Sequence, residues 1–177
     1  MIFESMKKLL VILAIPILSF GQIYFEEIEN KDDCHACPGF LVVTKNQLKD
    51  TIVTGSWGKV NSNYNIQKIG NKKYIVLESN YFSGGALEEG IHIYSTAKKD
   101  FLKKVFSKFY LTRSQKYKQL DNGHFQITSI EKDMSYKFEN NYLNIQLDTV
   151  VFITIEPEEN GKMISKGTKK EKYFIKN

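Results

Sequence analysis

The chain has 177 residues, of which 42% are hydrophobic, and a formal net charge of +5 at pH 7. Arg113 is the only arginine among its 25 basic residues. Because bidentate recognition of phosphate groups relies on arginine, this lysine-rich composition does not favour nucleic acid as a partner. It favours solubility and a loose attraction to acidic surfaces.

The N-terminus has the pattern of a signal peptide. Lys7 and Lys8 precede the apolar stretch 9–18, and small residues follow at Ser19–Gly21. We expect a signal peptide over residues 1–21, with an uncleaved anchor as the alternative. The protein would then be exported, periplasmic or secreted, with one β-rich domain of 156 residues (22–177). No later apolar stretch has the length of a membrane span, so none is expected after cleavage.

The first motif of the mature chain contains both cysteines, Cys34 and Cys37, with His35 between them and Pro38 directly after. A turn disulfide between the cysteines is the favoured interpretation for an exported chain. A thiol-redox site is the second, although the two preceding aspartates oppose a lowered thiolate pKa. A zinc site would need two further ligands. Haem attachment is excluded because proline, not histidine, follows the second cysteine.

Gly55–Gly58 predicts a tight turn that contains the only tryptophan, Trp57. The indole is expected to pack against the sheet; the alternative is a stacking platform for a sugar or a peptide.

These two motifs also carry a resemblance. Together with Ile69-Gly70 and the glycines between Ser83 and Gly90, they resemble a group of exported, uncharacterised bacterial proteins that have a Cys-His-Ala-Cys turn followed by a Gly-Ser-Trp-Gly turn. The resemblance covers Cys34–Tyr94. It implies an exported β-rich fold and brings no activity with it.

Short alternating or β-branched segments recur along the rest of the chain and predict a mainly β protein. The expected strands are 23–25, 40–45, 51–54, 64–69, 73–78, 90–94, 125–130, 135–138, 142–147, 150–155 and 172–175. Gly70-Asn71, Asp121–Gly123 and Asn160-Gly161 predict the turns between strands. Val150–Ile155 has the most apolar sequence and is expected to be the most buried strand. The pattern indicates a single antiparallel sandwich or barrel, or a set of propeller-like hairpins.

Residues 97–110 fit two structures. Phe101, Val105 and Phe109 lie on one face of a possible helix, which would be the only helix besides the signal peptide. The same residues also fit the second half of a hairpin after Ile91–Tyr94. The hairpin is favoured slightly because the neighbouring segments on both sides are strands.

Known catalytic and metal motifs are absent from the sequence, so no catalytic residue, metal or cofactor is expected. His92 and Tyr94 share one side of an expected strand and are candidate binding residues, together with His35 and Trp57. His92 is expected to face solvent or to be hydrogen-bonded. The first functional hypothesis is a non-enzymatic binding domain of the cell envelope for an unknown glycan, peptide or envelope protein. The alternatives are a periplasmic thiol-redox or metal-binding protein centred on the cysteines, and an inhibitor or immunity-type partner of a secreted enzyme.

Overall fold

A computed structural model describes residues 22–28, 39–54, 62–83, 85–156 and 161–176. Every regular element in these ranges is a β-strand, and all neighbouring strands pair in the antiparallel direction. The predicted mainly β, antiparallel fold is therefore confirmed. None of the described ranges contains a helix that could cross a membrane.

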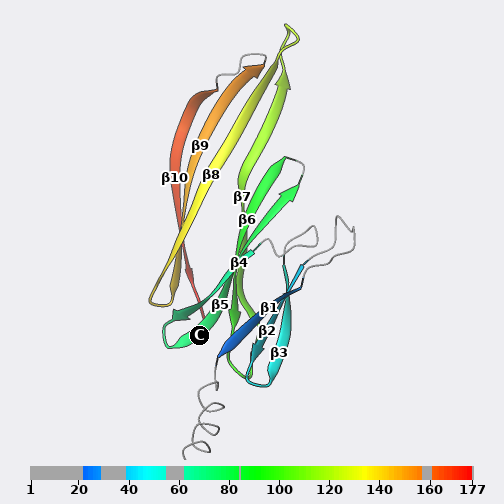
Figure 1. Cartoon of the computed structure of the whole chain (residues 1–177). Coiled ribbons are helices and arrows are strands. Elements are labelled where there is room, and N and C mark those ends of the chain that lie inside the picture. The colour runs from blue at the N-terminus through cyan, green and yellow to red at the C-terminus, as the bar shows by residue number, and fades with distance from the viewer. Residues whose placement is uncertain (1–21, 29–38, 55–61, 84, 157–160, 177) are drawn as a thin grey trace, which may run out of the picture.

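The ten strands form two sheets (Figure 1). The small sheet has the order β1-β2-β3, and the large sheet has the order β10-β9-β8-β7-β6-β5-β4. The small sheet consists of β1 (Ile23–Ile28), β2 (Gly39–Lys45) and β3 (Leu48–Thr54). The large sheet consists of β4 (Ser62–Ile69), β5 (Lys72–Ser83), β6 (Ala86–Ser95), β7 (Lys104–Gln119), β8 (Phe125–Glu139), β9 (Tyr142–Glu156) and β10 (Lys162–Phe174).

Tight turns connect the neighbouring strands of each sheet. Gly70 and Asn71 connect β4 to β5, with Ile69 paired to Lys72, as the sequence predicted. Gly70 has a φ of 60°, which glycine adopts without the steric cost that other residues meet. Asn46 and Asn140 take the same left-handed conformation in two other hairpins, which asparagine tolerates better than most residues.

The large sheet curls strongly, and its concave face contains the first hydrophobic core. The side chains come from β4 to β9 and from the segment after β10, so strands far apart in the sheet order meet across the curl. The fully or nearly fully buried members are Ile69, Tyr74, Val76, Ile91, Ile93, Tyr110, Leu143, Ile145, Leu147 and Ile175.

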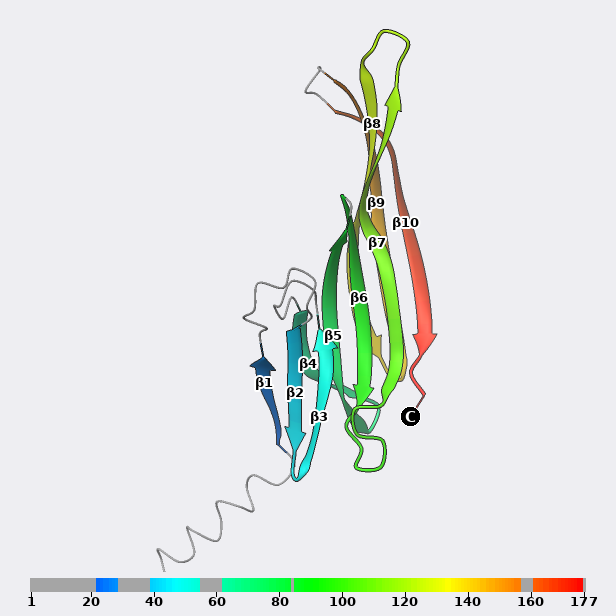
Figure 2. The same cartoon turned by 90° about the vertical axis from the view of Figure 1, so that its right-hand side faces the viewer.

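The second core lies between the small sheet and the convex face of the large sheet (Figure 2). Leu41, Val43 and Ile52 of the small sheet pack there against Ile75, Leu77 and Tyr94 of β5 and β6. Successive residues of a strand point to opposite faces, so β5 and β6 contribute to both cores. This burial on both faces is the reason that β5 contains the unbroken apolar run Tyr74–Leu77.

Residues 97–110 form a hairpin, as the sequence favoured. β6 ends at Ser95, a turn follows, and β7 begins at Lys104. The turn is closed by hydrogen bonds between the backbones of Ser95, Leu102 and Lys103. The alternative helix is therefore excluded for the residues that the structure describes.

Two sequence predictions about the C-terminal half are corrected. The segments 125–130 and 135–138 belong to the single strand β8, and 142–147 and 150–155 belong to the single strand β9. Val150–Ile155 is also not the most buried strand, because its residues are only half-buried. The ends of β7 to β10 project beyond β6 (Figures 1 and 2), where none of the described strands of the small sheet covers them.

Candidate functional site

A pocket of about 290 Å³ lies between the two sheets, at the end of β3. We call it the inter-sheet pocket. Val53 and Thr54 of the small sheet form one wall, and the convex face of β5, β6 and β7 forms the other. Its lining residues are Val53, Thr54, Leu77, Ser79, Asn80, Tyr81, Glu88, His92, Tyr94, Lys104 and Phe109.

His92 is fixed in the pocket wall by two serines. Its Nε2 atom is 2.9 Å from Ser79 Oγ, and its Nδ1 atom is 2.8 Å from Ser107 Oγ. The two serines stand on β5 and β7, on either side of β6. The register explains the arrangement, because Ser107 is directly opposite His92 and Ser79 is opposite Gly90.

Gly90 makes room for this arrangement. A Cβ atom at Gly90 would lie 2.7 Å from Ser79 Oγ, 2.8 Å from His92 Nε2 and 2.8 Å from Phe109 Cδ1. The absence of a side chain therefore lets the serine, the imidazole and the phenyl ring meet above the backbone of β6. Phe109 contacts the imidazole edge-on, with ring centroids 4.9 Å apart.

The imidazole of His92 is neutral at pH 7. Its side of β6 is covered by the small sheet, and the residue is only 5% exposed. Burial, assisted by the positive charge of Lys104, lowers the pKa of His92 to about 4. A neutral imidazole has one donor and one acceptor nitrogen, which matches two serine hydroxyls that can each donate or accept.

Tyr94 and Lys104 lie at one end of the pocket. The Lys104 ammonium group lies 5.7 Å from the centroid of the Tyr94 ring, within the range of a cation–π contact. Burial raises the pKa of the Tyr94 phenol, so this ring is uncharged near neutral pH. Glu88 lines the pocket six residues earlier in β6, roughly 20 Å away along an extended strand.

Thr54 is the unusual member of the lining. The residue is 2% exposed, and its hydroxyl has no hydrogen-bond partner among the described residues. A buried hydroxyl without a partner costs about 1–3 kcal/mol. Since Thr54 lines the pocket, a bound molecule with a polar atom could supply the missing hydrogen bond.

The polar groups of this pocket, Ser79, His92 and Ser107, are held in place by hydrogen bonds to one another. The distance from Ser79 to His92 is also that of a nucleophile and its base. However, an imidazole with a pKa near 4 is a weak base at neutral pH. Ser107 also lacks the negative charge with which a carboxylate stabilises an imidazolium. The arrangement is therefore better suited to holding a polar ligand than to transferring its proton.

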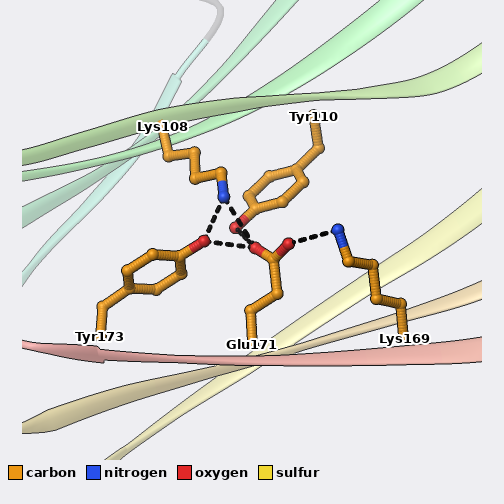
Figure 3. Close-up of polar contacts among 5 residues, drawn as sticks. All are labelled: Lys108, Tyr110, Lys169, Glu171 and Tyr173. Atoms are coloured by element: carbon orange, nitrogen blue, oxygen red, sulfur yellow. Dashed lines mark hydrogen bonds and ion pairs between the residues drawn. The ribbon is translucent and has the colours of Figure 1, made fainter.

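A second polar cluster lies on the concave face and joins strands that are not neighbours (Figure 3). Glu171 of β10 accepts hydrogen bonds from Lys108 at 2.9 Å and from Tyr110 at 2.7 Å, both on β7. Lys169 and Tyr173 of β10 also donate to this carboxylate. We call this group the Glu171 cluster.

The Glu171 cluster is a structural contact across the curl. Hydrogen bonds from Lys169, Tyr173, Lys108 and Tyr110 hold the pKa of the Glu171 carboxyl well below its usual range. Burial, followed by the hydrogen bond to Glu171, raises the pKa of Tyr110. Every charge in the cluster has a partner, so the cluster holds β7 and β10 together.

The predicted site residues fall into two groups. His92 and Tyr94 both lie in the inter-sheet pocket, where His92 is hydrogen-bonded as expected but buried rather than facing solvent. Cys34, His35, Cys37 and Trp57 lie outside the described residues, so their predicted disulfide, redox or stacking roles stay predictions.

Several residues of the pocket were not predicted from the sequence. Ser79, Thr54 and Phe109 come from three strands that are remote in sequence, and no local motif connects them. The one available signal was Gly90, two positions before His92 in an apolar strand, because a glycine inside a strand often marks a close approach.

No protein-family model, curated protein or solved structure matches the chain. The described residues also contain no group of three or more histidine, cysteine or acidic side chains placed to hold a metal ion.

Proposed function

We propose that the protein is an exported, non-enzymatic binding domain of the cell envelope, and that the inter-sheet pocket is its binding site. The observation that carries this proposal is the buried hydroxyl of Thr54, which faces a preformed pocket without a partner among the described residues. Native proteins rarely leave such a group unpaired, and a bound ligand is one of the few explanations that lets it be satisfied.

The surrounding side chains support a ligand that is polar and uncharged at its centre. Ser79 and the neutral imidazole of His92 are fixed next to one another. The charged groups of the lining stand far apart, because Glu88 is on β6 and Lys104 is on β7 opposite Tyr94. Leu77, Tyr94 and Phe109 supply apolar contacts. This mixture of apolar surface and a few fixed polar groups is typical of ligand pockets. Peptides and glycans both offer amide or hydroxyl groups between apolar surfaces.

The decisive variant is Thr54→Val, which removes the hydroxyl and nearly keeps the shape. We expect equal or higher stability in urea, because an unpaired buried hydroxyl is removed. Ligand binding should weaken, because the hydrogen bond to Thr54 is lost. Thr112→Val is the matched control: Thr112 is 1% exposed, but its hydroxyl donates to the Leu87 carbonyl at 3.2 Å. This control should lose about 1 kcal/mol of stability and keep its ligand affinity.

Binding is measured by titrating isotope-labelled protein with two defined probe sets, neutral oligosaccharides and acetylated hexapeptides, and following the NMR signals of the pocket. Support for the proposal is a saturable shift at His92 and Tyr94 with a weaker response in Thr54→Val. If neither probe set shifts these signals, or if Thr54→Val is destabilised as much as Thr112→Val, the proposal is wrong.

A further inference from the structure

The free edge of β3 borders the inter-sheet pocket. β3 is the last strand in the order β1-β2-β3, and within the described residues no strand pairs with its other edge. Lys45 pairs with Leu48 across a two-residue turn, so Leu48, Asp50 and Ile52 direct their backbone groups towards β2. The intervening residues direct theirs to the free edge. These residues are Lys49, Thr51 and Val53.

One of these edge amides has a side-chain partner. The backbone N–H of Thr51 donates to the neighbouring carboxylate of Asp50 at 2.8 Å. This contact is consistent with the register, in which the Thr51 N–H points away from β2 and makes no hydrogen bond to it. An aspartate over an edge amide is also a common protection against uncontrolled pairing of a free strand edge. Val53, nearer the pocket, is 62% exposed.

Next to this edge, β7 exposes a row of apolar side chains on the convex face. Phe109 and Leu111 are 50% and 41% exposed, although large apolar side chains on the opposite face of β7, such as Tyr110, are buried. Both residues follow the two-residue period of a strand, opposite Gly90 and Glu88 of β6, so the two side chains point to the same side. Phe109 also lines the inter-sheet pocket.

The alignment of the two sheets explains why this row is uncovered. β1 lies over β4, where Phe25 contacts Tyr64 with ring centroids 4.7 Å apart. β2 and β3 lie over β5 and β6, through the second core. The small sheet therefore ends one strand short of β7. Neighbouring strands are about 4.8 Å apart, so the next position beyond β3 lies over the row on β7.

We propose that the ligand of the inter-sheet pocket is a peptide segment in extended conformation, which pairs with the free edge of β3 as a fourth strand. This inference rests on the proposed function, because it uses the same pocket. Main-chain hydrogen bonds to the backbone of Val53 and to the Thr51 carbonyl provide affinity, because Asp50 already occupies the Thr51 amide. Alternate apolar side chains of the peptide cover Phe109 and Leu111. A polar group of the peptide reaches the Thr54 hydroxyl.

The dimensions favour a short segment over a folded partner. β3 has seven residues, and six extended residues span about 20 Å. A strip of one strand's width buries far less than the roughly 1,200–2,000 Å² of a stable interface between folded proteins. The charges of the lining stand towards its two ends, at Glu88 and Lys104, so the central part of the segment is uncharged.

The test begins with the mature full-length protein and a library of fluorescent, acetylated hexapeptides in which apolar and uncharged polar residues alternate. Binding is measured by fluorescence anisotropy. The tightest hexapeptide is then made in two N-methylated forms, one at odd and one at even positions. Because only alternate amides of an added strand face β3, we expect one form to bind at least about tenfold more weakly and the other to bind like the parent.

Protein variants locate the site. Phe109→Lys and, independently, Leu111→Lys are expected to weaken the parent hexapeptide about tenfold, because each places a charge under the added strand. Phe125→Lys is the matched control: Phe125 is 42% exposed on the same face of the sheet, but it lies at the beginning of β8, away from the pocket. This variant should bind the hexapeptide like the wild type.

The outcomes separate this inference from the proposed function. Strand addition is supported if one N-methylated hexapeptide binds more weakly than the parent, and if the Phe109→Lys and Leu111→Lys proteins also bind the parent hexapeptide more weakly. Equal binding of both N-methylated forms overturns strand addition but leaves the pocket as the site, provided that Thr54→Val still binds less. If only oligosaccharides bind, strand addition is also overturned and the pocket remains the binding site. A dimer of the protein that Phe109→Lys abolishes assigns the edge to a second copy and overturns the peptide. Failure of both probe sets overturns both proposals.

Discussion

At the scale of single residues, the inter-sheet pocket depends on pairs of side chains that no short motif connects. His92 meets Ser79 and Ser107 because the register of β5, β6 and β7 places them side by side, and Gly90 leaves the space above the strand open. The strand period predicted that His92 and Tyr94 share a face. It did not predict the burial of that face, because the small sheet that covers it comes from another part of the chain.

Gly90→Ala tests the space above β6. The new methyl group would approach Ser79 and His92 to within 2.8 Å, so one of the two must move and their hydrogen bond breaks. We expect a loss of about 2 kcal/mol in the free energy of unfolding, measured with urea. Gly167→Ala in β10 is the control, since nothing lies within 4 Å of the position that its methyl group would take. Equal stability of the two variants would contradict the close packing at Gly90.

The low pKa of His92 predicts a pH dependence. In the folded protein the pKa is about 4, against 6.5 for an unperturbed histidine. Between these values the unfolded chain binds a proton that the folded protein does not bind. The contribution of His92 is therefore fully present above pH 6.5 and is lost as the pH falls towards 4, by roughly 3 kcal/mol.

His92→Gln checks this prediction, because glutamine keeps one donor and one acceptor but does not titrate. Urea unfolding at pH 7 and pH 4.5 should show a smaller acid loss in the variant than in the wild type. The same acid loss in wild type and His92→Gln would show that other groups cause it.

At the scale of elements, the turns were the best predicted part of the structure. Gly70-Asn71 and Asp121–Gly123 lie between strands as expected, because these residues adopt turn conformations at little cost. The continuity of β8 and β9 was missed. Charged residues such as Glu131–Asp133 resemble a break between two strands, but in the curled sheet they continue the pairing with β9.

At the same scale, the Glu171 cluster stabilises the curled sheet, because it joins β7 to β10. Glu171→Gln removes the negative charge that pairs with the Lys108 ammonium group. The ammonium group then has only neutral hydrogen-bond acceptors in the cluster. We expect a loss of about 2 kcal/mol in the free energy of unfolding, because hydrogen bonds to charged groups are the stronger ones. Glu139→Gln, which breaks the exposed ion pair with Lys137, should have no measurable effect in the same urea titration. Equal effects of the two variants would remove the cluster from this role.

At the scale of the whole molecule, the two cores share β5 and β6. Ile75 and Leu77 face the small sheet, and Tyr74 and Val76 face the concave side of the large sheet. A core strand that serves two layers couples them, because it cannot unfold for one layer alone. The sequence predicted one domain over residues 22–177, and this sharing gives a physical reason to expect one cooperative unit.

Two core variants test this cooperativity. Leu41→Ala in the second core and Ile145→Ala in the first should each lower the free energy of unfolding by about 2–5 kcal/mol. In both variants, tryptophan fluorescence and far-ultraviolet circular dichroism should follow one coincident transition. Two separate transitions in either variant would show that the sheets unfold independently, and that the single-domain prediction is wrong.

The alternation of apolar and polar residues, with asparagine and glycine at the turns, was enough to determine the antiparallel β class and the positions of most strands, because these are local properties of the chain. Which face became covered was decided only by the tertiary structure. His92 is buried because the small sheet lies over β6, whereas the more apolar Val150–Ile155 is half-exposed because the described part of the small sheet does not reach the projecting ends of β8 and β9. Burial depends on packing between segments remote in sequence, and a strand's own residues do not contain that information.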